Sequence, residues 1–174
     1  MYFNSKTTKR STSIEEEIII KTKKSLKEKL NKEAQIVDIP PKMAKRFGEG
    51  KMLIPRPLDI AQLIKNVPSG KLITQRAIRE KLAKESKVTV TCPITTGIFL
   101  RMIAEAAEEE RREGAKDITP YWRVVKDDGS LNPKFPGGVG GQRAYLEREG
   151  HKVIEGKGKK PPKVVDFERY LVEL

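Results

Sequence analysis

Cysteine, histidine and tryptophan are almost absent from this chain of 174 residues: each occurs once, as Cys92, His151 and Trp122. A single cysteine excludes an intramolecular disulfide bond, and one cysteine with one histidine cannot form a Cys/His zinc site. The GEGK stretch at 48–51 is not a phosphate-binding loop, since it lacks the preceding strand and the Lys-Ser/Thr ending. The sequence therefore indicates neither a metal nor another cofactor.

Long apolar runs are lacking as well. No stretch approaches the roughly 20 apolar residues that a membrane-spanning helix needs. The first residues, MYFNSKTTKRSTS, are basic and polar, without the apolar segment of a secretory signal. We therefore expect a cytoplasmic protein, and a reducing compartment suits the single cysteine.

Positive charge is abundant by contrast. The chain holds 36 Lys and Arg against 24 Asp and Glu, which is a formal net charge of +12. A charge of this size keeps a protein soluble and attracts polyanions. An indifferent basic surface explains the same numbers, but nucleic acid is the first partner to test, and its binding would place the protein at the nucleoid.

Changes in composition divide the chain into four parts: a disordered basic tail at 1–12, a helical arm with a Pro/Gly-rich loop at 13–57, the main domain at 58–152, and a basic linker with a closing element at 153–174. The arm begins with the spacing of a capping box at Ser13–Glu16 and continues as an apolar stripe through Leu30. Repeated Pro and Gly then predict a loop or extended segment over 39–57.

The apolar spacing of the main domain predicts three helices in succession. The first covers 58–67, and the second follows an N-cap at Thr74. The third starts near Pro93, has a wide apolar face that includes Ile94 and Ile98, and runs to about Gly114. Five Glu in its last part make that end unattractive to phosphate.

A strand and a hairpin are expected after the third helix. Residues 117–126 read as a strand, Asp127–Gly129 as the turn, and a further helix ends at Gly150. Two helices, a connection, a third helix and a hairpin follow the order of a winged helix-turn-helix. The sequence therefore predicts an α+β, mainly helical fold of that type, with an N-terminal helical arm.

Three stretches of the main domain resemble one protein family. They are 67–80 (VPSGKLITQRAIRE), 118–131 (ITPYWRVVKDDGSL) and 137–152 (GGVGGQRAYLEREGHK). These resemble the C-terminal DNA-binding domain of O6-alkylguanine-DNA alkyltransferases and of their cysteine-less relatives, the alkyltransferase-like proteins. The resemblance covers roughly 58–152. The family turns an alkylated guanine out of the duplex and transfers its alkyl group to a cysteine in a Pro-Cys-His-Arg-Val motif.

The resemblance implies that this chain has lost that reaction centre. Tyr121 stands at the position of the family's cysteine and Trp122 at that of its histidine. Neither a phenol nor an indole is a soft nucleophile or a general base. Glu149 matches the family's relay glutamate, and Gln75 matches the tyrosine that helps to turn out the nucleotide. The arginine that fills the vacated base stack maps to about Ile94.

Phe135 and Pro136 correspond to walls of the family's lesion pocket. Tyr121 and Trp122 have two readings at this stage: they stack on a displaced base, or they close the pocket and pack as core. Cys92 is a displaced alkyl acceptor in a third reading, since it lies at a helix N-terminus, but no base is near it in sequence.

Several polar and basic residues are candidate DNA contacts. Each is also explained as an ordinary surface residue, and together they predict salt-dependent binding. They are Lys71, Arg76, Thr91, Ile94, Thr95, Thr96, Arg101, Arg123, Lys126 and Arg143.

The resemblance implies a monomeric, non-catalytic protein that binds duplex DNA, senses O6-alkylguanine or a related lesion, and marks it for other repair proteins. Two alternatives remain open from sequence. The first is an active methylated-DNA–protein-cysteine methyltransferase that uses Cys92, and the second is an interaction module that does not bind DNA.

Overall fold

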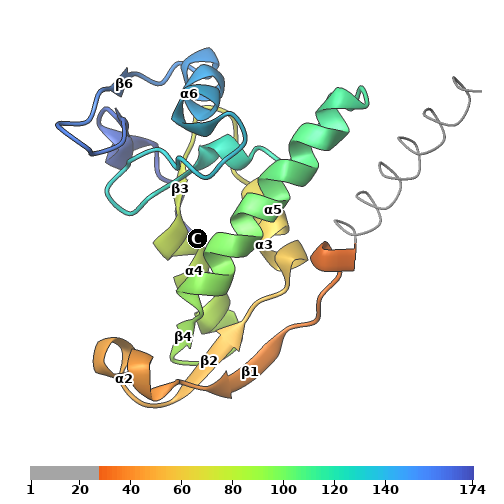
Figure 1. The fold of residues 1–174 in the computed structure, drawn as a ribbon, viewed down its shortest axis with the longest axis vertical. Helices are drawn as coiled ribbons and strands as arrows, with labels where there is room; N and C mark the ends of the chain where they lie inside the picture. Colours follow the sequence, from red (N-terminus) through yellow and green to blue (C-terminus); the bar gives the residue numbers. More distant parts are fainter. Residues whose placement is uncertain (1–27) are drawn as a thin grey trace, which may run out of the picture.

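The computed structural model describes residues 28–174 and has a mixed, helix-rich α+β fold (Figure 1). The tail expected at 1–12 lies outside the described residues, as does the helix expected over 13–30 apart from the helical Glu28–Leu30. The elements follow one another as β1 (Gln35–Asp38), α2 (Pro41–Phe47), β2 (Lys51–Ile54), α3 (Pro57–Lys65), β3 (Ile73–Thr74), α4 (Gln75–Glu85), β4 (Val90–Thr91), α5 (Pro93–Arg112), the 3-10 helix η1 (Tyr121–Arg123), β5 (Val124–Val125), α6 (Gly138–Arg148), β6 (Val153–Ile154), β7 (Lys163–Val164) and the 3-10 helix η2 (Phe167–Tyr170).

The long helix α5 runs through the middle of the molecule, and α3, α4 and η1 pack against it (Figure 1). The three helices predicted for this region are confirmed with close boundaries. The Thr74 hydroxyl accepts a hydrogen bond from the Ala77 amide at 3.1 Å, so Thr74 is the N-cap of α4 as expected. Leu100 and Ile103 of α5 are buried in the main core.

The prediction of a loop or extended segment over 39–57 missed the helix α2, whereas β2 is indeed extended. β2 pairs antiparallel with β1 and parallel with β4, which gives a sheet of order β1-β2-β4. Gly48 and Gly50 have φ of 79° and 135°, values that suit glycine in the tight connection between α2 and β2. Strands of four residues bounded by Pro and Gly carry too few side chains for their alternation to show in sequence.

The strand expected over 117–126 is wrong in extent and in partner. Only Val124–Val125 is extended strand, and it pairs in parallel with β3. The turn at Asp127–Gly129 is present, but no regular hairpin follows it. Across the turn, the Lys126 amide donates a backbone hydrogen bond to the Ser130 carbonyl at 2.9 Å. In place of an extended strand, residues 121–123 form the 3-10 helix η1, in which the rings of Tyr121 and Trp122 are buried.

Residues 153–174 close the core from one end. β7 pairs antiparallel with β6, and Val164 and Phe167 belong to the main core. Gly129 has a φ of 82°, and a Cβ on this residue would overlap the ring of Phe167. Among residues 28–174, no helix is long and apolar enough to cross a membrane.

Candidate nucleic-acid interface

A groove lies along the first half of α5 and is the largest cavity that we describe, with a volume of about 770 Å³. Its other walls come from the N-terminus of α4, the segment 126–134 and Lys29 and Lys32, so it joins parts of the chain that are distant in sequence. We name it the α5 groove. Its lining consists of Lys29, Lys32, Gln75, Pro93, Ile94, Gly97, Ile98, Phe99, Arg101, Met102, Glu105, Lys126, Asn132, Pro133 and Lys134.

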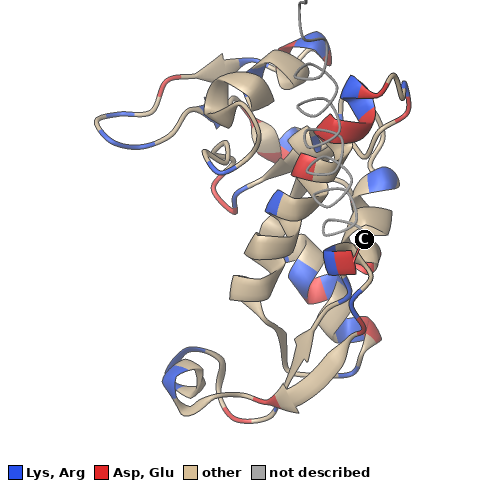
Figure 2. Ribbon diagram, turned by 45° about the vertical axis from the view of Figure 1, so that its right-hand side comes forward, with Lys and Arg blue, Asp and Glu red and all other residues tan. Residues whose placement is uncertain are grey.

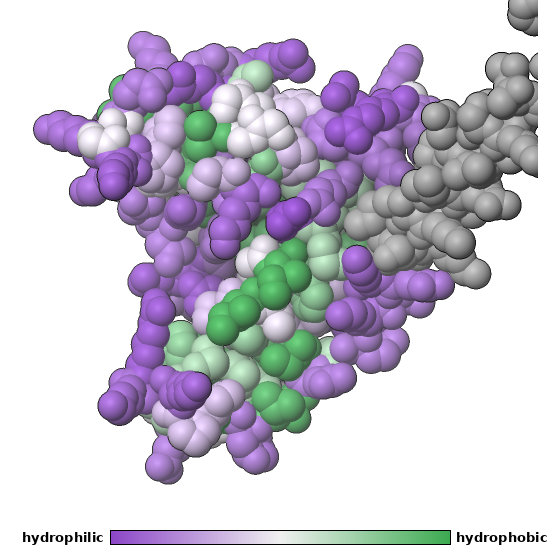
Figure 3. All heavy atoms as spheres, in the orientation of Figure 1, coloured by the Kyte–Doolittle hydropathy of each residue, from purple (hydrophilic) through white to green (hydrophobic). Residues whose placement is uncertain are grey.

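The α5 groove exposes apolar side chains that a folded protein usually buries. Ile94 is 65% exposed and Ile98 is 52% exposed, although Phe99 beside them is buried. A band of hydrophobic surface crosses this face along the start of α5, between hydrophilic margins (Figure 3). The apolar face expected for this helix is therefore divided: one side packs into the core, and the Ile94–Ile98 row faces the groove.

Positive charge borders this apolar band. Lys29, Lys32, Lys126, Lys134 and Arg101 line the groove against a single carboxylate, Glu105. That carboxylate is occupied, because Arg101 Nε donates to Glu105 Oε1 at 2.7 Å. The groove thus combines exposed apolar side chains with an excess of cations, a pairing that suits bases and phosphates together.

The lesion pocket expected from sequence is not open in the structure. Tyr121 is 1% exposed, and its ring meets those of Trp122, Phe135 and Tyr145 edge to face at centroid distances of 5.5, 5.3 and 6.0 Å. This geometry is that of core packing and leaves no face of Tyr121 for a base. Assigning Tyr121 and Phe135 to a base-accepting wall is therefore wrong. Pro136 is half-buried and does not line the groove.

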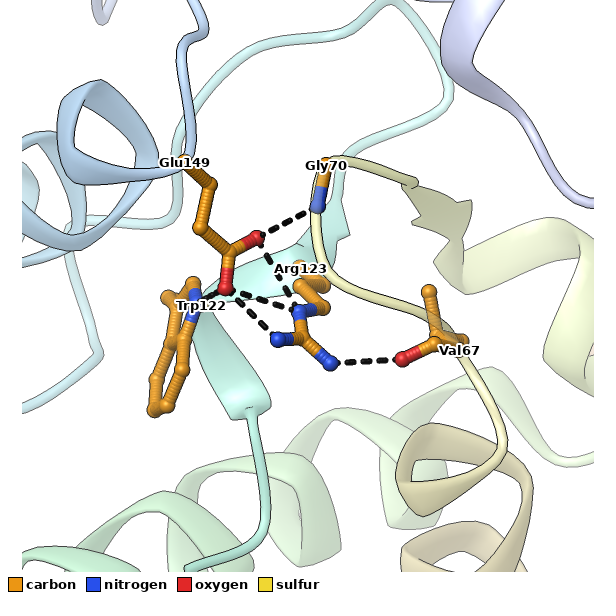
Figure 4. Close-up of polar contacts among 5 residues, drawn as sticks. All are labelled: Val67, Gly70, Trp122, Arg123 and Glu149. Carbon is orange, nitrogen blue, oxygen red and sulfur yellow. Dashed lines mark hydrogen bonds and ion pairs between the residues drawn. The ribbon is translucent and has the colours of Figure 1, made fainter.

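Trp122 is held in place by the residue that matches the family's relay glutamate. Its Nε1 donates to Glu149 Oε1 at 2.9 Å (Figure 4). Its ring stacks on that of Tyr145 at a centroid distance of 4.2 Å. The indole therefore occupies both its hydrogen-bonding group and one face within the protein, and it is only 9% exposed. Trp122 also lines a small cavity of about 270 Å³ with Lys65, Lys116 and Pro120, so its assignment to a lesion wall stays a prediction.

Glu149 connects three segments of the chain (Figure 4). Besides the indole, it accepts hydrogen bonds from Arg123 Nε and NH2 at 3.0 and 2.6 Å and from the Gly70 amide at 3.1 Å. Burial acts to raise the pKa of Glu149, but the bonds from Arg123, Trp122 and Gly70 outweigh it and hold the pKa below its ordinary value. Sequence reasoning left Glu149 without a partner, whereas the structure makes it a structural anchor.

Arg123 is consequently not a phosphate contact, which corrects the prediction. Its side chain is 13% exposed, and its NH1 donates to the Val67 carbonyl at 2.6 Å. The hydrogen-bond donors of the guanidinium are thus occupied by Glu149, at the end of α6, and by Val67, which follows α3.

Glu108 is a buried anchor that sequence reasoning missed. It was grouped with the acidic, solvent-facing end of α5, but it accepts hydrogen bonds from Tyr121 and Tyr145 hydroxyls at 2.9 and 2.7 Å and from Arg111 Nε at 2.9 Å. Burial acts to raise its pKa, and these donors lower it further than burial raises it. The available signal was its spacing, since Glu108 follows Ala104 and Ile103 on the buried face of α5.

The remaining predicted DNA contacts divide by exposure. Thr91 and Thr96 are 0% and 1% exposed, and their hydroxyls donate to backbone carbonyls at 2.9 and 2.7 Å, so neither hydroxyl is free to donate to DNA in this structure. Thr95 is half-buried, and Arg143 pairs with Glu155. The exposed or groove-lining candidates are Lys71, Arg76, Ile94, Arg101 and Lys126, and Gln75, predicted for the lesion pocket, lines the groove as well.

Cys92 is not placed to accept an alkyl group. It is 5% exposed and packs with Ile39, Met52 and Val90 in a small second core beneath the first sheet. A thiol needs both a base and an approach for the substrate, and burial among apolar side chains removes the approach. The structure therefore does not favour the alternative that uses Cys92, which stays a prediction.

No family model and no curated protein matches the chain. The solved structures that are similar to it include two at 16% identity, and each of these matches covers 68% of this chain and 94% of the other. One is S. pombe Atl1 in complex with damaged DNA containing O6-carboxymethylguanine, with a TM-score of 0.47. The other is S. pombe ATL in complex with DNA, with a TM-score of 0.48.

Proposed function

We propose that this protein binds duplex DNA through the α5 groove without catalysing alkyl transfer. The observation that carries the proposal is the exposed Ile94–Ile98 row inside a groove bordered by five Lys and Arg side chains. Exposed apolar side chains among cations are typical of proteins that insert a wedge between base steps while cations hold the phosphates.

The docking proposed here is that of a winged helix-turn-helix. α4, the connection through β4, and α5 follow in that order, with the N-terminus of α5 entering a groove of the duplex. The turn at Asp127–Gly129 and the segment up to Lys134 take the place of the wing. Ile94, at the second position of α5, is the side chain placed to fill a vacated space in the base stack.

Recognition of O6-alkylguanine or a related lesion is the finer part of the proposal. A displaced base would enter the α5 groove, whose volume suffices for a small ligand, and not the closed ring cluster around Tyr121. Gln75 and Asn132 supply polar groups there, and Phe99 and Met102 supply the apolar floor. The base-accepting place is thus shifted relative to the resemblance-based expectation.

The proposal includes a monomer that acts in the cytoplasm at the nucleoid and presents the bound lesion to other repair proteins. The replaced Cys-His pair supports a role in marking damage, because the chain offers no exposed thiol to accept the alkyl group.

A titration of plain and O6-methylguanine duplexes at two salt concentrations tests the proposal. We expect both duplexes to bind, more weakly at high salt, and the O6-methylguanine duplex to bind more tightly. Equal affinities would remove lesion sensing and leave general DNA binding. Absence of duplex binding even at low salt would overturn the proposal in favour of an interaction module.

In a second experiment, the protein is incubated with duplex DNA in which the methyl group of O6-methylguanine is labelled. We expect the label to stay on the DNA after prolonged incubation with the protein. Label on the protein that disappears in Cys92→Ser would contradict the non-catalytic assignment.

A further inference from the structure

A second cavity lies on the other side of α4, between this helix and α2, and we name it the α2–α4 pocket. Its volume is about 500 Å³. Four basic side chains line it, namely Arg46, Arg76, Arg79 and Lys84, against one carboxylate, Glu80. Lys and Arg positions of α2 are visible at the lower end of the molecule (Figure 2).

The cations of the α2–α4 pocket are poorly neutralised by the protein itself. Arg76 and Arg79 share one carboxylate, Asp127, at 3.3 and 3.8 Å. Within residues 28–174, Arg46 and Lys84 have no carboxylate partner, and both are exposed. An excess of unpaired, exposed cations around a cavity favours an anion with several charges.

The α2–α4 pocket and the α5 groove meet at the start of α4. Gln75 lines the groove and Arg76 lines the pocket, so the two cavities are reached from neighbouring residues whose Cα atoms are about 3.8 Å apart. A second junction repeats this arrangement, because Thr91 borders the pocket and Pro93 the groove. One strand of DNA advances about 3.4 Å per nucleotide along the helix axis, so a few nucleotides connect the two cavities.

We infer that the α2–α4 pocket binds backbone phosphates of the same duplex that occupies the α5 groove. This inference rests on the proposed function and extends its footprint to Arg46 and Lys84, two residues that were not expected from sequence to contact DNA. The β1–α2–β2 unit, whose β2 pairs with β4, thereby becomes part of the DNA-binding surface. The pocket holds four basic side chains and one carboxylate, so its net positive charge suits the repeated negative charges of phosphodiester groups.

The experiment measures how duplex affinity depends on salt for three proteins. The test variant is Arg46→Ala/Lys84→Ala, since both side chains are exposed and neither makes an ion pair with a described residue. The control is Lys157→Ala/Lys159→Ala, two exposed lysines of the β6–β7 connection, at the other end of the molecule from α2 (Figure 1). Both variants lose the same charge, so a general electrostatic effect is matched.

We expect the slope of log K against log salt to become shallower by about 0.9 for each phosphate that the protein no longer neutralises, hence by about 1 to 2 in the test variant. The control should keep the slope of the unmodified protein to within about 0.5, because its lysines lie away from both cavities. Hydroxyl-radical footprinting should show protection shortened on one side of the duplex in the test variant alone.

Equal slopes in the test and control variants would overturn the inference. If the unmodified protein still binds the duplex in that case, the proposed function is upheld. Inorganic phosphate and a mononucleotide provide a separate arm. If they bind the pocket and are lost in Arg46→Ala/Lys84→Ala with an unchanged duplex slope, the pocket is a site for free anions and the inference is wrong. If the unmodified protein binds no duplex, both the inference and the proposed function are wrong.

Discussion

Replacing Glu149 by Gln tests the role that the structure gives to this position. The carboxylate accepts hydrogen bonds from the Trp122 indole, from Arg123 and from the Gly70 amide. A Gln amide keeps one accepting oxygen, but it turns an NH2 group toward one of these donors and leaves the Arg123 guanidinium without a counter-charge. The side chains of Glu149 and Arg123 are only 11% and 13% exposed, so solvent compensates little.

Breaking a buried ion pair by removing one partner costs about 3 to 5 kcal/mol. Residual exposure here reduces the expected loss for Glu149→Gln to about 2 to 4 kcal/mol. For a chain of this size, that loss lowers the melting temperature by roughly 5 to 15 °C. Glu147→Gln is the control, because Glu147 is exposed on the same helix and should change stability by less than about 0.5 kcal/mol.

The effect of Glu149→Gln depends on pH with a defined sign. The pKa of Glu149 is lower in the folded than in the unfolded protein, so its contribution is complete above the unfolded pKa of about 4.3 and is lost as the pH falls through the folded pKa. Urea unfolding should therefore separate the two proteins clearly at pH 7 and progressively less toward pH 3. A Glu149→Gln protein as stable as the Glu147→Gln control at pH 7 would refute this account of the anchor.

Three further changes follow from the same structure and are measured by urea unfolding. Tyr121→Phe removes one of the donors to the buried carboxylate of Glu108, and we expect a loss of about 1.5 to 3 kcal/mol; an unchanged midpoint would contradict that bond. Burial lowers the pKa of His151, so its contribution to stability is complete above the unfolded pKa of about 6.5 and is lost as the pH falls through the folded pKa. His151→Phe should lose this part of the pH dependence, and parallel pH profiles would disprove the assignment. Gly129→Ala requires an unfavourable positive φ and overlap with the ring of Phe167, so it should cost at least about 1 kcal/mol, and a stabilised protein would be the opposite result.

Periodicity and caps allowed the main helices to be predicted. α3, α4 and α5 each present apolar residues at helical spacing, and Thr74 and Pro93 mark where two of them begin. These signals are local, so they need no knowledge of the rest of the chain. The bounds and partners of the two-residue strands could not be found in this way: β3 was not predicted, and β5 was predicted only as part of a longer strand over 117–126. Pairing partners far apart in sequence define these strands.

The candidate site was less predictable than the helices. Residue type indicates which side chains can contact DNA, but only packing decides which of them are exposed. Thr91 and Thr96 turn inward to satisfy backbone carbonyls, whereas Ile98, which the apolar spacing of α5 placed on a packing face, is exposed. Ile94, a predicted DNA contact, is exposed beside it. The residue types at positions 121 and 122 argue against catalysis. They do not show whether the rings of Tyr121 and Trp122 enclose a pocket.

The central claim is that duplex DNA binds the exposed apolar row of the α5 groove. One anisotropy titration tests it most directly, with a labelled duplex and Ile94→Ala/Ile98→Ala. The matched control is Ile36→Ala/Ile154→Ala, which removes two isoleucines that are 56% and 55% exposed elsewhere. Loss of apolar contact worth about 1 kcal/mol for each side chain should weaken binding about tenfold or more in the groove variant and leave the control unchanged. Equal affinities for the two variants would contradict the claim.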